Sequence, residues 1–322
     1  MASIHSAIVR CFRTSSSEII IAMDLSLSNL IGWARLDFKI NDKPNRALGT
    51  MAITIEKLSD AAGAAISGLD LTNPLSSEDT DALTKAWHDH MVLLLRGQEL
   101  TEDEQERFCR VFGEIAGLKS TKSDSKFLFV TNKEDPKLAT AVQLGEMMFH
   151  YDQAYSEHPC KASTLYSIEV PDVGGNTCFA NCCAVYDQLN DDWKERLENK
   201  TALNYFNYDT NPSLRPDEVD PNAPQFSHPV IRTHPVTGRK SIYVNRLMSI
   251  RINEVDREES DEILDYLFDL IESPQNVYEH VWQAHDLVLW DNRCTAHARK
   301  HYDPEKRRLL RRMTILDENP VA

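Results

Sequence analysis

The chain has 322 residues and a formal net charge of -15, and its 42% hydrophobic and 26% charged residues are ordinary for a globular protein. No apolar run approaches the ~20 residues that a membrane-spanning helix needs, which argues against a membrane protein. The acidic balance excludes a general nucleic-acid binder, because neutralising phosphates requires a basic face.

Residues 1–50 differ in composition from the rest of the chain. Their first part, MASIHSAIVRCFRTSSS, is rich in Ser, contains two Arg and has no acidic residue, which would suit a transit peptide and an organellar location. Alternatively, Met51 opens the folded domain at MAITIEKLSDAAGAAISGLDL. We expect this second arrangement, with a poorly ordered extension over residues 1–50 and one domain over residues 51–322.

Within residues 51–322 the hydrophobic pattern predicts three helices and a larger number of short strands. One helix follows Ser76, the next opens with Thr101 and Glu104 in capping-box spacing, and the last carries apolar residues at helical spacing. The helices are predicted over residues 76–90, 101–115 and 256–271. The strands are predicted over residues 91–96, 162–170, 228–234, 240–245, 286–291 and 311–316. Many short strands with few helices favour a sandwich, a barrel or a jelly roll.

The seven cysteines give a hint about the compartment. Their number is odd and no CxxC spacing occurs. This pattern indicates neither a disulfide framework nor a zinc knuckle, and it favours a reducing environment. We therefore expect a cytoplasmic protein.

Two His-X-Asp triplets are candidate metal sites. They are His150/Asp152 in MMFHYDQAYSEHP and His301/Asp303 in RKHYDPEKRR. Residues i and i+2 of a strand point to the same face, so both side chains of such a pair can reach one metal ion. The first pair follows an apolar stretch, whereas Asp303 precedes Pro304, which favours an exposed turn. We therefore predict that the first pair binds the metal.

A third ligand has to come from elsewhere, because two ligands rarely make a functional site. His297 is the strongest candidate, since it follows the predicted strand 286–291 by a few residues. Two His and one carboxylate form a facial triad with open coordination positions, as in non-haem Fe(II) oxygenases. Taken alone, His150 would more often be a hydrogen-bonded histidine than a ligand, so the remaining pattern matters.

Arginines in RRLLRRMTIL complete that pattern. If this stretch is a strand, Arg308 and Arg312 share a face and lie about 13 Å apart along it. Arg307 and Arg311 lie on the opposite face, and we expect these two side chains to be solvated. The apolar residues of the stretch fall mostly on that opposite face, so the pattern alone leaves open which face points inward. A guanidinium binds carboxylate through two parallel hydrogen bonds, which suits a dicarboxylate cosubstrate whose other end chelates iron.

These candidate residues lie in the first and the third of three longer stretches of the chain: FHYDQAYSEHPCKASTLYSIEVPDVGGNTCFAN, HPVIRTHPVTGRKSIYVN and LVLWDNRCTAHARKHYDPEKRRLLRRMTIL. Together they closely resemble the taurine/2,4-dichlorophenoxyacetate dioxygenase family of Fe(II)- and 2-oxoglutarate-dependent enzymes. The likeness runs from about Ile53 to Asp317, in the same order and with compatible gaps. The resemblance implies a double-stranded β-helix, a jelly-roll core wrapped by helices, and thus a mainly β fold with flanking helices.

The resemblance also implies roles for individual residues. The iron ligands would be His150, Asp152 and His297. Thr177 in GGNTCFAN would hydrogen-bond the cosubstrate carboxylate, and Arg308 would pair with that carboxylate. Arg312 would hold the anion of the substrate.

One segment departs from the pattern of taurine-using members. Where they place a His and a Tyr after FGE, this chain reads FGEIAGLKSTKS over residues 112–123. The difference argues against taurine, and Lys119 is either a replacement cation or a surface lysine. In NRLMSIRI the residue that faces the substrate would be Met248, whose flexible side chain suits a hydrophobic tail or an aryl group.

The sequence thus predicts an Fe(II)- and 2-oxoglutarate-dependent dioxygenase that uses O2 to hydroxylate a small anion, such as a sulfonate, an alkyl sulfate or an aryloxyalkanoate, with succinate and CO2 as co-products. Because family members commonly assemble as dimers or larger oligomers, we also expect a homo-oligomer without nucleic-acid or membrane partners. Two alternatives keep the fold: a catalytically silent jelly roll that binds a metal or a small acid, and a zinc-dependent hydrolase. The hydrolase would leave Thr177 and Arg308 without a role.

Overall fold

The computed structural model describes residues 9–13, 19–23, 52–117, 126–133, 140–142, 145–206, 215–216, 219–318 and 321. The chain divides into two compact units, Met1–Gly49 and Thr50–Ala322. In the first unit β1 (Val9–Arg13) pairs antiparallel with β2 (Ile19–Met23). The rest of residues 1–50 lies outside the described residues, so a poorly ordered extension stays a prediction.

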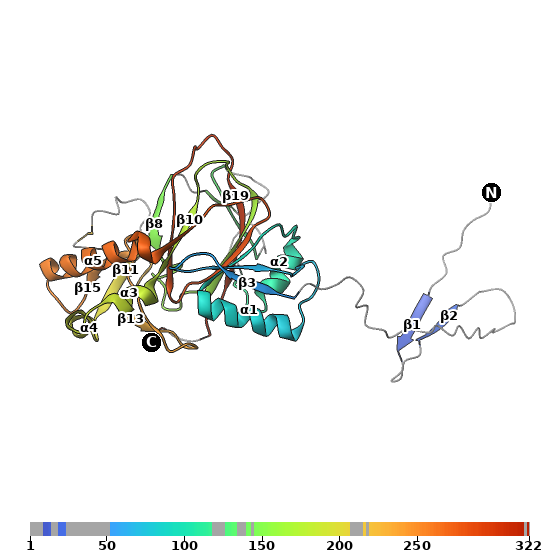
Figure 1. Ribbon diagram of the computed structural model, residues 1–322, viewed down its shortest axis with the longest axis horizontal. Helices are drawn as coiled ribbons and strands as arrows, with labels where there is room; N and C mark the ends of the chain where they lie inside the picture. Colours follow the sequence, from blue (N-terminus) through green and yellow to red (C-terminus); the bar gives the residue numbers. More distant parts are fainter. Residues whose placement is uncertain are drawn as a thin grey trace. The chain divides into compact units, whose positions relative to one another are not determined.

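The second unit is built around two sheets (Figure 1). In order across the larger sheet, the strands are β3 (Thr54–Lys57), β4 (Ala64–Ser67), β5 (Val92–Leu95), β17 (Leu287–Asp291), β9 (Ala162–Glu169), β19 (Leu309–Ile315), β6 (Leu128–Thr131) and β7 (Thr140–Val142). Across the smaller sheet they are β16 (Val277–His280), β10 (Thr177–Asn181), β18 (Thr295–Arg299) and β8 (Met147–His150). Neighbouring strands are antiparallel except β4 with β5 and β6 with β7.

The two sheets face each other across a buried apolar core. Because successive side chains of a strand alternate between its faces, Val288 and Trp290 of β17 enter this core together with Phe179 of β10. Leu287 and Leu289 of β17 point the other way, into a second cluster. Two sheets packed in this way form a jelly roll, and the predicted mainly β fold with flanking helices is confirmed.

Two helices cover the outer face of the larger sheet. They are α1 (Ser77–His90) and α2 (Glu102–Cys109), and their apolar residues complete the second cluster. Ser76 caps α1 by accepting a hydrogen bond from the backbone N–H of Asp79, and Thr101 and Glu104 form the predicted capping box of α2. The second helix is shorter than the predicted range 101–115.

A further layer packs on the opposite side of the strands (Figure 1). It contains β11 (Thr201–Tyr205), β12 (Gln225–Pro229), β13 (Ile231–Thr233), β14 (Lys240–Ile242), β15 (Ser249–Ile252), α3 (Cys182–Gln188), α4 (Asp191–Leu197), α5 (Arg257–Ile271) and the 3-10 helix η1 (Pro274–Asn276). The helix predicted over 256–271 corresponds to α5, whereas α3 and α4 were not predicted. Asn181 and Asn190 accept hydrogen bonds from the first turns of α3 and α4. An Asn in this capping position is the sequence signal that could have predicted the two helices.

Each predicted range overlaps a strand of the structure, and the differences lie at the ends; β19, for example, begins at Leu309, before the predicted range 311–316. None of the helices in the described part of the chain combines the length and the apolar character needed to cross a bilayer.

Candidate metal centre

The first candidate ligands lie where β8 ends. His150 is the last residue of β8, and Asp152 lies in the turn that follows, where Gln153 has a positive φ of 59°. Asp152 therefore reaches the site through a turn and not, as strand periodicity predicts, as part of one strand face with His150. β18 supplies His297, which pairs with His150 in the antiparallel register, and the centroids of the two rings are 4.1 Å apart.

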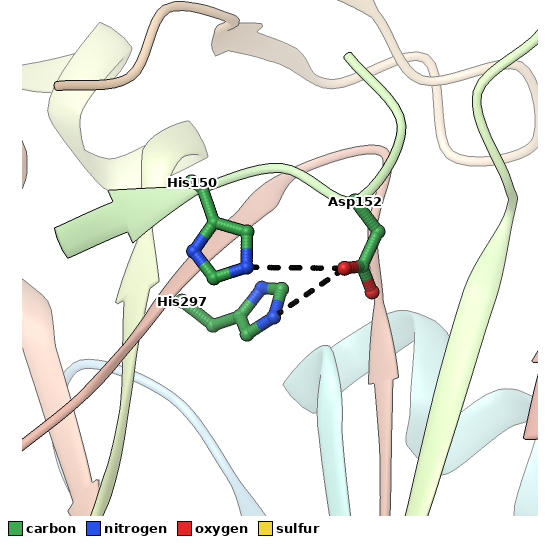
Figure 2. A group of neighbouring side chains, drawn as sticks. All are labelled: His150, Asp152 and His297. Carbon is green, nitrogen blue, oxygen red and sulfur yellow. Dashed lines mark ion pairs between the residues drawn. The ribbon is translucent and has the colours of Figure 1, made fainter. Parts of the chain in front are cut away.

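The three side chains converge (Figure 2). Oδ1 of Asp152 lies 3.9 Å from Nε2 of His150 and 3.7 Å from Nε2 of His297, and all three ligand atoms lie within 4.8 Å of one another. The two carboxylate–imidazole separations are too long for hydrogen bonds, whereas two ligands that each bind one ion at about 2.1 Å can be up to about 4.2 Å apart. The fold thus brings the predicted ligand set together, and its spacing and donor chemistry fit a divalent metal ion.

Hydrogen bonding and burial prepare the histidines to bind a metal. Nδ1 of His150 lies 2.9 Å from the carbonyl oxygen of Met148, so we assign the proton to Nδ1 and the free lone pair to Nε2. Burial lowers the pKa of His150 and the pKa of His297, and the neighbouring His150 lowers the pKa of His297 further. Both rings are therefore neutral imidazoles, the form that binds metal ions.

The second carboxylate oxygen of Asp152 is held by the protein. Oδ2 accepts a hydrogen bond from the Ser163 hydroxyl at 2.8 Å and forms an ion pair with Arg312 at 2.6 Å. Burial alone would raise the pKa of Asp152, but lowering effects, of which the charge of Arg312 is the largest, outweigh it, so this pKa lies well below its usual value. Asp152 is therefore ionised, with Oδ1 directed to the histidines and Oδ2 to the protein.

A pocket beside these ligands contains the residues expected to bind the two anionic compounds. Its lining includes His150, His297, Thr177, Arg299, Arg308 and Arg312. The fold thus brings the two ligand histidines, the predicted cosubstrate residues Thr177 and Arg308, and Arg312 to one pocket.

Thr177 and Arg308 give the pocket two groups that suit an anion. Oγ1 of Thr177 accepts a hydrogen bond from the indole N–H of Trp282 at 3.0 Å, which leaves the Thr177 hydroxyl hydrogen to be donated elsewhere. Arg308 is only 2% exposed, and its Nε donates to the carbonyl oxygen of Gly175 at 3.2 Å. Burial, followed by the charge of Arg299, lowers the pKa of Arg308 to about 9, which still leaves it protonated at neutral pH. A bound carboxylate would compensate this buried cation.

Two glycines allow the chain to close over Arg308. Gly174 and Gly175 have φ values of +82° and +69°, where residues with a Cβ are strained. A Cβ on Gly175 would lie 3.2 Å from Cδ and Nε of Arg308, and one on Gly174 would lie 2.6 Å from the carbonyl oxygen of His301. The turn that contains Gly174 and Gly175 thus forms part of the wall behind Arg308.

Other predicted residues do not come to the pocket. Met248 is 2% exposed, lies in a buried apolar cluster and is not among the described residues that line the pocket. Lys119 lies outside the described residues. The alternative pair His301 and Asp303 is exposed, and Asp303 accepts a hydrogen bond from the backbone N–H of Glu305, in agreement with the predicted turn.

The opposite face of β19 differs from the expectation. Arg307 is exposed and lies 3.5 Å from Glu169, but Arg311 is 6% exposed and donates to Oε1 of Gln105 at 2.6 Å and to the carbonyl oxygen of Leu100 at 2.9 Å. The prediction that Arg311 is solvated is wrong because α2, which contains Gln105, packs over this face of the larger sheet.

Two residues beside the ligands were not predicted. Arg299 follows His297 by two positions on β18, so the rule of alternating faces could have placed it in the pocket. Ser163 reaches Asp152 from β9, and no local spacing in the sequence signals a contact that depends on sheet topology.

A second group of potential ligands, His234, Asp291 and Cys294, is also buried. Nε2 of His234 lies 3.0 Å from Oδ2 of Asp291, and its Nδ1 accepts hydrogen bonds from two backbone N–H groups of the following turn. Arg293 donates to both carboxylate oxygens of Asp291, at 2.8 and 2.6 Å. His234 and Asp291 are therefore already engaged by hydrogen bonds within the protein.

Most of the second unit is similar to known proteins. The family model described as "Taurine catabolism dioxygenase TauD, TfdA family" matches residues 54–314. An alpha-ketoglutarate-dependent 2,4-dichlorophenoxyacetate dioxygenase of Cupriavidus pinatubonensis is 30% identical over 292 residues, which cover 84% of this chain and 100% of the relative. An alkylsulfatase of Acinetobacter baylyi is 28% identical over 280 residues, which cover 84% of this chain and 86% of the relative.

Solved structures agree with these relatives. The crystal structure of AAD-2 in complex with Mn(II) and N-oxalylglycine is similar with a TM-score of 0.72 and 30% identity, over 84% of this chain and 100% of that chain. The three candidate ligands and the pocket arginines all lie within the matched residues 54–314.

Proposed function

The chain belongs to the TauD, TfdA family of dioxygenases, and we propose that it hydroxylates a small organic anion held by Arg312 beside the metal centre. It is a 2-oxoglutarate-dependent non-haem iron dioxygenase, with Fe(II), 2-oxoglutarate and O2 as cofactor and cosubstrates. The observation that carries the proposal is that one pocket combines two ligand histidines with two separate arginines, Arg308 and Arg312.

In this proposal the iron is held by His150, Asp152 and His297. Two imidazoles and one carboxylate suit Fe(II) and leave coordination positions open. When bound, the iron together with 2-oxoglutarate and O2 supplies the oxidising chemistry, and succinate and CO2 are the co-products. The protein contributes binding, orientation and electrostatics.

Arg308 and Thr177 hold the far carboxylate of 2-oxoglutarate. Arg308 provides a buried guanidinium, and Gly175 fixes its Nε from behind. Thr177 provides a hydroxyl whose oxygen is already engaged by Trp282, so its hydrogen is free to point to the carboxylate. These contacts leave the other end of the cosubstrate to reach the ligands.

Arg312 holds the anionic group of the substrate. Its guanidinium pairs with Oδ2 of Asp152, so an anion bound to Arg312 would lie next to a metal ligand. A carbon close to that anion would then be the one exposed to oxidation. The relatives support this choice, since one is named for 2,4-dichlorophenoxyacetate and the other is an alkylsulfatase.

We also propose how the chain is organised. Residues 51–322 form the dioxygenase domain and residues 1–50 an extension, a division supported by the family match that starts at residue 54. The chain assembles as a homo-oligomer in this proposal, because members of the family commonly form dimers or larger oligomers. Light scattering after gel filtration would test the oligomeric state. A cytoplasmic location is supported by the cysteines in the described part of the second unit, which are free thiols.

The proposed substrate class is tested by succinate formation. The protein is supplied with Fe(II), 2-oxoglutarate and O2 and is offered aryloxyalkanoates, alkyl sulfates and alkyl sulfonates, each beside a neutral counterpart such as its methyl ester or parent alcohol. We expect succinate with at least one anion and little with its neutral counterpart. Equal turnover of the neutral compound would contradict the role of Arg312, and no turnover of any compound by the metal-loaded protein would favour the catalytically silent alternative.

A further inference from the structure

One buried amide side chain forms hydrogen bonds with both the backbone N–H and the backbone carbonyl group of a proposed metal ligand. Asn292 lies between β17 and β18 and is 0% exposed. Its Oδ1 accepts a hydrogen bond from the backbone N–H of Asp152 at 2.8 Å, and its Nδ2 donates to the carbonyl oxygen of Asp152 at 3.0 Å. The amide thus binds Asp152 as a neighbouring strand would.

The same residue joins three parts of the jelly roll. Nδ2 of Asn292 also donates to the carbonyl oxygen of Cys160 at 2.9 Å, and its own backbone N–H donates to the carbonyl oxygen of Lys161 at 2.9 Å. Asn292 therefore connects the turn after β8 with the start of β9. It stands in the turn that leads into β18, the strand that carries His297.

Asp152 needs such a connection because the sheet does not provide one. β8 ends at His150, so regular strand pairing no longer fixes the backbone at Asp152. The next residue, Gln153, has a positive φ of 59°, an uncommon backbone conformation for a residue other than glycine. A metal ligand has to be placed to within a fraction of an ångström, and here the hydrogen bonds of Asn292 replace those of the sheet.

We propose that Asn292 is a positioning residue of the metal centre, which fixes the backbone of Asp152 so that Oδ1 meets Nε2 of His150 and His297. Asn292 does not touch the metal or the substrate and acts through Asp152 alone. The inference rests on the proposed role of Asp152 as a ligand. Residues that orient metal ligands typically contribute 10- to 100-fold to metal affinity.

The test measures metal binding without turnover. Co(II) is titrated into the metal-free full-length protein, and binding is followed by calorimetry and by the visible absorption of Co(II), which reports the number of ligands. In Asn292→Ala we expect the Kd for Co(II) to rise about 10- to 100-fold, together with an altered Co(II) spectrum.

A matched variant separates this role from a general loss of stability. Asn276 is another buried amide, 1% exposed, which donates to the carbonyl oxygen of Leu270 at 2.9 Å and accepts from Gln188 at 2.6 Å. Asn276→Ala should lower Tm but leave the Kd and spectrum of Co(II) as in the wild type. If both variants weaken Co(II) binding equally, Asn292 is only a structural residue.

A double-mutant cycle with Asp152→Ala decides whether Asn292 acts through Asp152. Asp152→Ala must itself weaken Co(II) binding; if it does not, the proposed ligand set fails, whatever Asn292 does. In the Asp152→Ala background, Asn292→Ala should cause little further loss, and an undiminished loss there would overturn the inference. Should Asn292→Ala fail to fold, Asn292→Ser takes its place, and wild-type affinity in that variant would equally overturn it.

Discussion

A single methyl group on Gly175 should weaken the binding of 2-oxoglutarate. Gly175 and Gly238 share the same φ of +69°, but their surroundings differ. A Cβ on Gly175 would lie 3.2 Å from Cδ and Nε of Arg308, whereas one on Gly238 would meet no atom within 4 Å. Gly238→Ala therefore carries the backbone cost alone, and Gly175→Ala carries the same cost and displaces Arg308.

The magnitudes follow from these contacts. The left-handed backbone costs each alanine variant about 1–2 kcal/mol of folding free energy, so both should lose a similar amount of stability. Hydrogen bonds to charged groups contribute about 1.5–3 kcal/mol each. Losing roughly half of one such bond between Arg308 and the cosubstrate would raise the Kd for the cosubstrate about 4- to 13-fold in Gly175→Ala.

Calorimetric titration of 2-oxoglutarate into the Mn(II)-loaded protein measures this Kd without turnover, and thermal unfolding measures the stability of each variant. We expect Gly238→Ala to bind 2-oxoglutarate like the wild type. If Gly175→Ala binds it as tightly as Gly238→Ala, then Arg308 does not hold the cosubstrate in the way described.

Three further predictions concern the ligands, the substrate anion and acid stability. Asp152→Ala should abolish iron-dependent succinate formation, and Asp303→Ala should leave it nearly intact; the reverse result would mean that the other His-Tyr-Asp is the metal site. Arg312→Gln should raise the KM for an anionic substrate at least about tenfold, because a charge-assisted bond is lost, while the KM for the cosubstrate stays within about twofold; an equal change in both would contradict separate roles. Burial lowers the pKa of His228 from 6.5 to about 4, so between these values the unfolded chain takes up a proton that the folded protein refuses. The free energy of unfolding is therefore unaffected by His228 above pH 6.5. As the pH falls from 6.5 toward 4, protonation of His228 in the unfolded chain lowers this free energy by up to about 3 kcal/mol. Denaturant unfolding should show that the free energy of unfolding depends less on pH in His228→Gln than in the wild type. An unchanged pH dependence would refute the role given to His228.

Much of the metal centre could be predicted from sequence because its chemistry depends on residue types at short spacing. His150 with Asp152, and His297 after a buried strand, are local patterns of this kind. Strand alternation nevertheless does not explain how the first pair converges, since Asp152 lies in a turn beyond β8. The spacing identified the residues, while the geometry that joins them depends on the turn and on Asn292.

What could not be predicted depends on which elements pack on each other. Strand periodicity gives two faces without telling what covers them, so it could not show that α2 covers the face with Arg311. Met248 stands in a motif that predicts contact with the substrate, but the layer around α5 buries it away from the pocket. Ser163 and Asn292 reach Asp152 across the sheets, and contacts between distant parts of the chain leave no periodic signal.

The proposal that this pocket binds iron and 2-oxoglutarate together is open to one direct measurement. Fe(II) and then 2-oxoglutarate are added to the metal-free protein without O2, and the visible charge-transfer band of the iron chelate is recorded. We predict that the band appears in the wild type, is lost in Asp152→Ala and shifts when a suitable anion is added. A folded protein that binds iron but never develops the band with 2-oxoglutarate would contradict the proposal.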